Sequence, residues 1–151
     1  MSVRKGKIRY AVVGLGHLAQ VAVLPAFAHA KNSELVALVS GDKKKLAKLG
    51  RLYRIDRLYD YDRLEECLQK GVDAVYIVLP NHLHKEFTLR AAAAGAHVLC
   101  EKPMAVTSPE CREMIESARK HRRKLMIAYR LHFEKPICRR WKLREAANWE
   151  I

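Results

Sequence analysis

Short apolar runs alternate with amphipathic stretches along the whole chain. Runs of mostly apolar residues cover 8–13, 34–40, 57–59, 73–79, 96–100 and 124–129, which predicts six strands. Between them, helical patterns cover 17–30, 43–53, 63–69 and 83–94, and a further one starts at 108. The 73–79 run is nearly all apolar, as expected for a central strand that is covered on both faces. Alternating strands and helices favour a parallel sheet with helical crossovers.

Polar and glycine residues mark the ends of these predicted helices. Asp42 is placed to cap the second helix, and Gly71 and Gly95 follow the third and fourth. Thr107 and Glu110 have the spacing of a capping box at the start of the fifth. Its predicted apolar face consists of Cys111, Met114, Ile115 and Ala118. Six strands with intervening helices predict an α/β fold with a doubly wound parallel sheet, the dinucleotide-binding Rossmann architecture.

A glycine-rich turn joins the first strand to the first helix. It has the pattern G-x-G-x-x-A, and its residues are Gly14, Leu15, Gly16, His17, Leu18 and Ala19. In this context, Gly14 allows a tight turn and Gly16 removes the Cβ that would block a pyrophosphate. The helix N-terminus then offers N–H groups to the phosphates. The alternative is a purely structural glycine turn.

The end of the second strand bears on which nicotinamide cofactor is bound. An acidic residue there would bond the ribose 2′-hydroxyl, but this chain has Ser40, followed by Gly41. A lysine cluster that includes Lys45 follows, which favours the 2′-phosphate of NADP. Asp42 keeps NAD as the alternative, and the lysines have a second interpretation as a solvated helix face.

Polar residues also follow the fourth and fifth strands, at the sheet edge where ligands bind in open α/β folds. Leu79, Pro80, Asn81 and His84 lie at the carboxyl end of the fourth strand. Glu101, Lys102 and Pro103 follow the fifth. A lysine here can hydrogen-bond a substrate hydroxyl and assist its proton transfer. From spacing alone, His84 and Lys102 are equally compatible with exposed residues that serve only solubility.

The net charge of +13 raises the question of an anionic partner. The excess is concentrated at 43–48, at 119–124 and in the last seventeen residues. We expect solvated helix faces and no nucleic-acid binding, because no aromatic residues interleave with the 119–124 cluster.

No run approaches the ~20 apolar residues of a membrane span, and no signal segment precedes the first strand, so a cytoplasmic location is expected. The four scattered cysteines favour free thiols, and no metal site is expected.

Together these motifs resemble the glucose-fructose oxidoreductase / inositol dehydrogenase / MocA (Gfo/Idh/MocA) family, and most closely its glucose-fructose oxidoreductase branch. The likeness covers about residues 6–134 and also includes Leu24, Pro25 and Ala26, and Tyr59, Asp60 and Tyr61. It implies that Lys102 is the catalytic lysine. It further implies that Ser40, Lys45 and Tyr59 surround the adenosine end of the cofactor. The rest of the groove would be lined by Asn81, His84, Glu101 and Arg130.

The resemblance ends abruptly after Phe133. We therefore interpret 1–134 as an NAD(P)-binding Rossmann domain and 135–151 as an aberrant tail. One permitted back-translation of 136–151, read in the neighbouring frame, gives a pattern that resembles the helix expected after this motif. A frameshift is one explanation, and a truncation followed by an unrelated tail is the other. The coding DNA distinguishes them.

By this resemblance, the intact parent transfers a hydride between nicotinamide and a carbon of a sugar or cyclitol that bears a hydroxyl. The family's C-terminal α+β domain, with its catalytic histidine and oligomer interface, is expected to be absent here. We therefore expect weak cofactor binding, no useful turnover, and self-association through uncovered apolar surface. Whether the chain is itself an enzyme is left open. The alternatives are a stand-alone nucleotide-binding regulatory module with a basic tail, and a non-catalytic relative completed by a partner chain.

Overall fold

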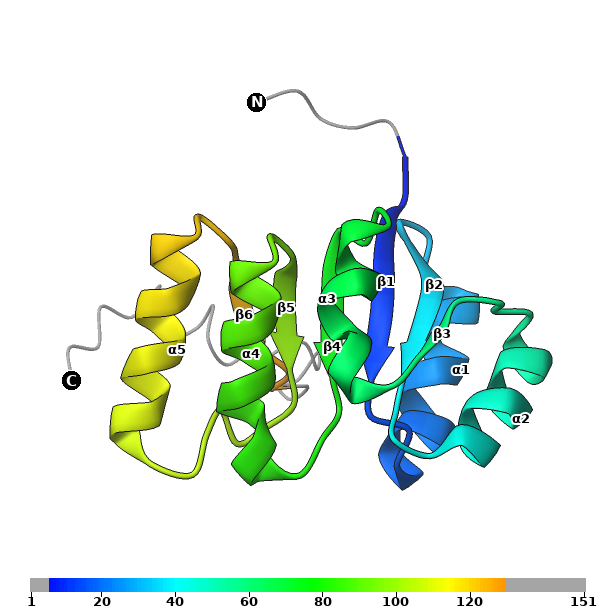
Figure 1. The fold of residues 1–151 in the computed structure, drawn as a ribbon, viewed down its shortest axis with the longest axis horizontal. Coiled ribbons are helices and arrows are strands. Elements are labelled where there is room, and N and C mark those ends of the chain that lie inside the picture. Colours follow the sequence, from blue (N-terminus) through cyan, green and yellow to red (C-terminus); the bar gives the residue numbers. More distant parts are fainter. Residues whose placement is uncertain (1–5, 130–151) are drawn as a thin grey trace, which may run out of the picture.

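Six parallel strands form one sheet in the computed structural model, which describes residues 6–129 (Figure 1). The strands are β1 (Ile8–Val13), β2 (Ser33–Val39), β3 (Leu58–Tyr59), β4 (Ala74–Ile77), β5 (His97–Cys100) and β6 (Leu125–Ile127). Their order is β3-β2-β1-β4-β5-β6, and every neighbouring pair is parallel. The predicted doubly wound α/β sheet is thereby confirmed.

The helix after β1 is less regular than predicted. Residues 17–29 are helical, but they include a π-helical segment (Ala19–Val23), α1 (Leu24–Ala26) and a 3₁₀ turn (Phe27–His29). The backbone N–H of Leu24 donates to Ala19, five residues back. Pro25 explains the irregularity, because its ring lacks an N–H and crowds the carbonyl of the preceding turn.

The other helices lie near their predicted places. They are α2 (Lys43–Tyr53), α3 (Leu64–Gln69), α4 (His84–Ala93) and α5 (Ser108–Lys120), with short 3₁₀ turns before α3 (Tyr61–Arg63) and α4 (Asn81–Leu83). Both predicted N-terminal caps are present. The Asp42 side chain accepts from the N–H of Lys45, and Thr107 and Glu110 form a capping box. On α5, Met114 and Ala118 are buried as predicted, but Ile115 remains 38% exposed.

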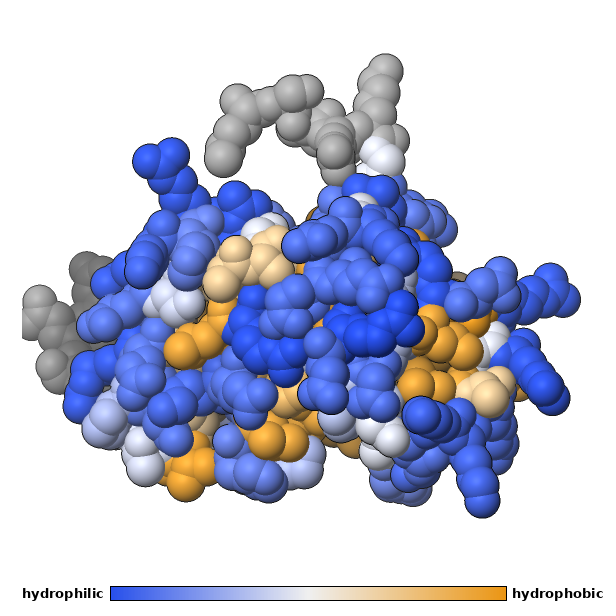
Figure 2. Space-filling model, viewed as in Figure 1, coloured by the Kyte–Doolittle hydropathy of each residue, from blue (hydrophilic) through white to orange (hydrophobic). Residues whose placement is uncertain are grey.

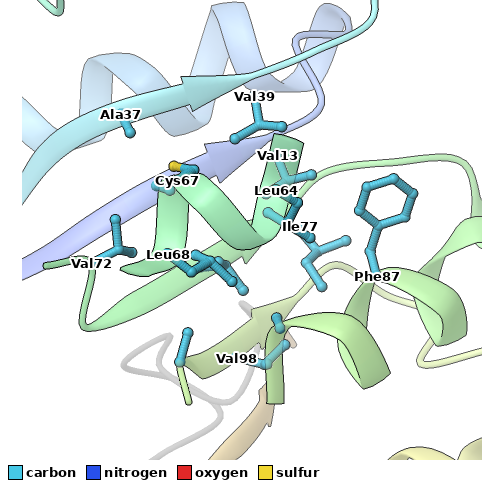
Figure 3. Packing of buried hydrophobic residues seen from close by; sticks show 14 of the residues in the cluster. Val13, Ala37, Val39, Leu64, Cys67, Leu68, Val72, Ile77, Phe87 and Val98 are labelled. Carbon is cyan, nitrogen blue, oxygen red and sulfur yellow. The ribbon is translucent and has the colours of Figure 1, made fainter. Parts of the chain in front are cut away.

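Two apolar layers flank the sheet. Successive side chains of a strand point to opposite faces, so Val12 belongs to one layer and Val13 to the other. Helices α1 and α2 cover the first layer through residues such as Leu24 and Leu46. Helices α3, α4 and α5 cover the second, where Phe87 packs near Ile77 (Figure 3). The two layers hold the sheet between the helices and so fix the carboxyl ends of the strands, which carry the candidate site.

The surface over α3, α4 and α5 is mostly hydrophilic (Figure 2). One apolar hollow of about 360 Å³ lies where α5 meets β6. Its lining residues are Met104, Ile115, Ala118, Arg119, Arg123, Leu125 and Ile127. Within residues 6–129, no helix has the length and apolar character to cross a membrane.

Candidate functional site

The loops that follow the strands converge on the carboxyl edge of the sheet. Backbone hydrogen bonds join them to the neighbouring strands: Gly14 N donates to Val39 O over 2.9 Å, and Val78 N donates to Val13 O over 2.8 Å. Glu101 N donates to Ile77 O over 3.0 Å. Because β1 and β4 are neighbours with crossovers in opposite directions, the strand order reverses between them. This is the point where open α/β sheets bind ligands.

The glycine turn requires a glycine at position 14. Its φ is +96°, and a Cβ there would collide with the Val78 carbonyl oxygen and lie 2.8 Å from Leu79 Cδ2. A Cβ on Gly16, by contrast, would meet no atom within 4 Å. The turn is therefore packed on its inner side and open at Gly16. That open space, next to a helix N-terminus, suits a pyrophosphate.

The rest of the motif divides into buried and exposed residues. Ala19 is fully buried in the layer beneath α1. The Leu15 side chain is also buried, so only its backbone borders the open space, whereas His17 and Leu18 are exposed. The Gln20 amide donates to Leu15 O over 3.0 Å and braces the turn. The motif does not specify position 20, so we did not predict this contact.

Ser40 follows β2 directly and is nearly buried. Its N–H donates to Tyr59 O over 3.0 Å, and its Oγ accepts from Asp42 N over 3.2 Å. Lys45 is exposed and lies 3.2 Å from the Asp42 carboxylate. Hydrogen bonds from Lys45 hold the pKa of Asp42 below its ordinary value. Asp42 thus contacts both Ser40 and Lys45 at the end of β2.

Tyr59 lies differently from the exposed position that its predicted role suggests. Its side chain is only 5% exposed and belongs to the layer covered by α3. The cations of Arg63 and Lys70 lie 5.3 Å and 5.6 Å from its ring centroid. The backbone carbonyl of Tyr59 is what meets Ser40. A role at the adenosine end would therefore involve its backbone, and it stays a prediction.

The segment after β4 divides in the same way. Pro80 and Asn81 are exposed at the edge of the sheet, and Leu79 is largely buried. His84 is completely buried. Its Nδ1 lies 2.8 Å from Pro103 O and its Nε2 lies 2.8 Å from Leu79 O. The His84 ring is therefore placed to hold two loops together and has no surface open to a cofactor.

Glu101 and Lys102 follow β5 at the same edge. The Glu101 carboxylate accepts from the Tyr76 hydroxyl over 2.7 Å and from the Lys102 backbone N–H over 3.3 Å. Lys102 is exposed and is joined to Pro103 by a cis peptide bond. Burial, followed by the contact with Glu101, raises the pKa of Tyr76 above its ordinary value. We predicted Tyr76 only as part of a strand.

The remaining predictions concern Arg130, the tail, metal binding and the cysteines. Arg130, expected to line the groove, and the 135–151 tail lie outside the described residues. Within residues 6–129, no three His, Cys, Asp or Glu side chains are grouped so as to hold a metal ion. Cys67, Cys100 and Cys111 are free thiols. Burial raises the pKa of Cys67 to about 11 and that of Cys100 to about 12.

The glycine turn, the reversal of strand order and the polar strand ends define a nucleotide-binding Rossmann domain. Residues 8–129 match the family described as "Oxidoreductase family, NAD-binding Rossmann fold", the GFO_IDH_MocA family. The chain belongs to this family.

Known relatives agree with this assignment. D-xylose 1-dehydrogenase [NADP(+)] of Haloarcula marismortui is 35% identical over 137 residues, which are 89% of this chain and 38% of that protein. The structure of aldose-aldose oxidoreductase from Caulobacter crescentus, complexed with glycerol, superposes with a TM-score of 0.90 at 43% identity. It matches 93% of this chain and 43% of its own.

A third relative was solved with a cofactor. It is a variant of KijD10, a 3-ketoreductase from Actinomadura kijaniata, in complex with TDP-benzene and NADP. Its TM-score is 0.84 at 27% identity, and the match covers 93% of this chain and 44% of that one. The chain therefore spans between a third and a half of the length of these relatives.

Proposed function

We propose that this domain binds NADP, with NAD as the weaker ligand, for an oxidoreductase that acts on sugar or cyclitol hydroxyls. The observation that carries the proposal is the open space at Gly16, next to a helix N-terminus and at the reversal of strand order. Backbone N–H groups and the helix dipole favour a pyrophosphate there. The sugar class rests on the family and on the names of its relatives.

The preference for NADP rests on the end of β2. Ser40 occupies the place where an acidic residue would bond a ribose 2′-hydroxyl. The carboxylate of Asp42, two residues after Ser40, accepts from the N–H of Lys45 and lies 3.2 Å from its ammonium. In our proposal, the 2′-phosphate takes a hydrogen bond from the Ser40 hydroxyl and draws the Lys45 ammonium toward it. Relatives are known with NADP and with NAD, so the choice between the two cofactors rests on these residues at the end of β2.

Lys102 is the proposed catalytic residue. Its side chain is exposed at the carboxyl edge, beyond the buried ends of β4 and β5. A bound nicotinamide would supply the carbon that accepts or returns the hydride. As a neutral amine, Lys102 would accept a hydrogen bond from the substrate hydroxyl and take up its proton during oxidation; as an ammonium, it would return that proton during reduction. Because the chain spans less than half of each relative described above, we expect cofactor binding rather than turnover from these 151 residues.

Titration with NADPH and NADH, followed by the fluorescence of the reduced cofactor, tests this function. We expect NADPH to bind more tightly. Lys45→Ala should weaken NADPH binding by about tenfold, the effect of one charge-assisted hydrogen bond, and leave NADH binding unchanged. Lys48→Ala, on the same exposed helix, is the matched control. Equal affinity for both cofactors, or an equal loss in the control, would contradict the NADP assignment.

A further inference from the structure

The segment 101–103, which carries Lys102, is held at both ends by side chains from β4 and α4. The Glu101 carboxylate accepts a hydrogen bond from the Tyr76 hydroxyl, and the carbonyl of Pro103 faces Nδ1 of His84. Lys102, between them, is exposed. The exposed residue of this segment is therefore flanked by two fixed points.

His84 links this segment to the end of β4. The ring is completely buried, and each nitrogen lies 2.8 Å from a carbonyl oxygen, one on Pro103 and one on Leu79. A neutral ring donates to one of the two carbonyls, and a protonated ring donates to both. In either state the ring occupies the space between the two loops. The contact with Leu79 is buried and the contact with Pro103 is partly buried, so loss of the ring would remove hydrogen bonds that water does not fully replace.

Tyr76 holds the other end. Its half-buried hydroxyl donates to one carboxylate oxygen of Glu101, whose other oxygen accepts from the Lys102 N–H. Burial and the Glu101 charge raise the pKa of Tyr76, so the hydroxyl keeps its proton at neutral pH. The contact crosses from β4 to the residue after β5, and it fixes the Glu101 carboxylate and, through it, the Lys102 N–H.

We propose that Tyr76 and His84 are positioning residues that fix the two ends of segment 101–103 and so place the Lys102 amine at the nicotinamide end of the cofactor groove. Neither residue is assigned contact with the cofactor. The placement is a property of the free chain. Its consequence for binding rests on the proposed function.

The first experiment measures the placement without any ligand. In backbone NMR spectra, Tyr76→Phe and His84→Gln should shift or broaden the Lys102 and Met104 resonances and leave that of Gly16 unchanged. The glutamine nitrogen takes about the place of Nε2, whereas an asparagine nitrogen takes about the place of Nδ1. His84→Asn therefore keeps a donor near Pro103 and should restore much of the wild-type spectrum.

Two variants serve as matched controls. Tyr10→Phe removes a hydroxyl from a half-buried tyrosine on β1 that makes a ring contact with Phe27. His29→Gln changes an exposed histidine at the end of the first helical segment. Neither should move the Lys102 resonance. A thermal melt of each variant shows whether it folds. If Tyr76→Phe and His84→Gln leave Lys102 and Met104 unchanged in folded protein, the proposal is wrong.

The second experiment separates the two ends of the cofactor. Glu101 and Lys102 are proposed to border the nicotinamide end of the groove, so Tyr76→Phe and His84→Gln should each weaken NADPH binding by about threefold to tenfold, the effect of losing one hydrogen bond from this segment. Adenosine 2′,5′-bisphosphate lacks the nicotinamide, so its affinity should not change. An equal loss for both ligands would indicate a general structural defect and overturn the positioning role. A wild-type chain that binds neither ligand would refute the proposed function, while the NMR experiment still decides the placement.

Discussion

Gly14→Ala should destabilise the fold more than any other glycine-to-alanine change in the turn. The φ of +96° disfavours an alanine by about 1–2 kcal/mol. The new Cβ would also collide with the Val78 carbonyl and lie 2.8 Å from Leu79, and such overpacking costs about 1–3 kcal/mol. The sum is about 2–5 kcal/mol, a large part of the stability of a small domain. Equilibrium urea denaturation followed by circular dichroism measures it.

Substitutions at two other glycines separate the conformational cost of the positive φ from the cost of the Cβ collision. Gly95 also has a positive φ, +90°, but a Cβ there meets no atom within 4 Å, so Gly95→Ala should show only the conformational cost of about 1–2 kcal/mol. Gly16→Ala meets no atom either, so it should leave stability almost unchanged and weaken cofactor binding. A Gly14→Ala variant that loses no more stability than Gly95→Ala, or a Gly16→Ala variant that is unfolded, would contradict these values.

Three further predictions follow from the structure. Burial, and then neighbouring cations, lower the pKa of His97. The contribution of His97 to the free energy of unfolding should therefore be fully present above about pH 6.5 and be lost as the pH drops below it. In urea titrations, His97→Gln should show a smaller loss of stability at low pH. Cys111 should react with a thiol reagent in the native state, whereas buried Cys67 and Cys100 should react only on unfolding, as peptide mass spectrometry would show. Thr107→Ala should cost about 1 kcal/mol in a urea melt, because it removes a helix cap.

Much of the fold could be predicted because local patterns and the core agree. Apolar runs became strands, and Asp42 and Thr107 cap helices as expected. The predicted strand at 73–79 is shorter in the structure, Ala74–Ile77, and the chain bends at Leu79. The π-helical segment before Pro25 was missed, since periodicity alone does not show how a helix accommodates a proline. Ile115 has helical spacing but too little covering structure to be buried.

The sequence predicted which sheet edge carries the candidate site, but not the burial and contacts of its side chains. The residues after each strand meet at one edge because parallel strands bring their carboxyl ends together. Burial depends on long-range packing, so the sequence did not show that Tyr59 and His84 lie inside. The Tyr76–Glu101 contact requires the register of β4 against β5, which pairs Tyr76 with Leu99, two residues before Glu101. A lone tyrosine in an apolar central strand was the available signal.

The central claim is that a nicotinamide dinucleotide binds at the carboxyl edge of the sheet. A backbone NMR titration of the chain with NADPH tests it most directly. We expect saturable shifts at Gly16, Ser40 and Lys102 that Gly16→Ala strongly weakens. Shifts concentrated at Gly71 and Gly95, which precede β4 and β5 at the opposite edge, would contradict it. So would a spectrum that NADPH leaves unchanged.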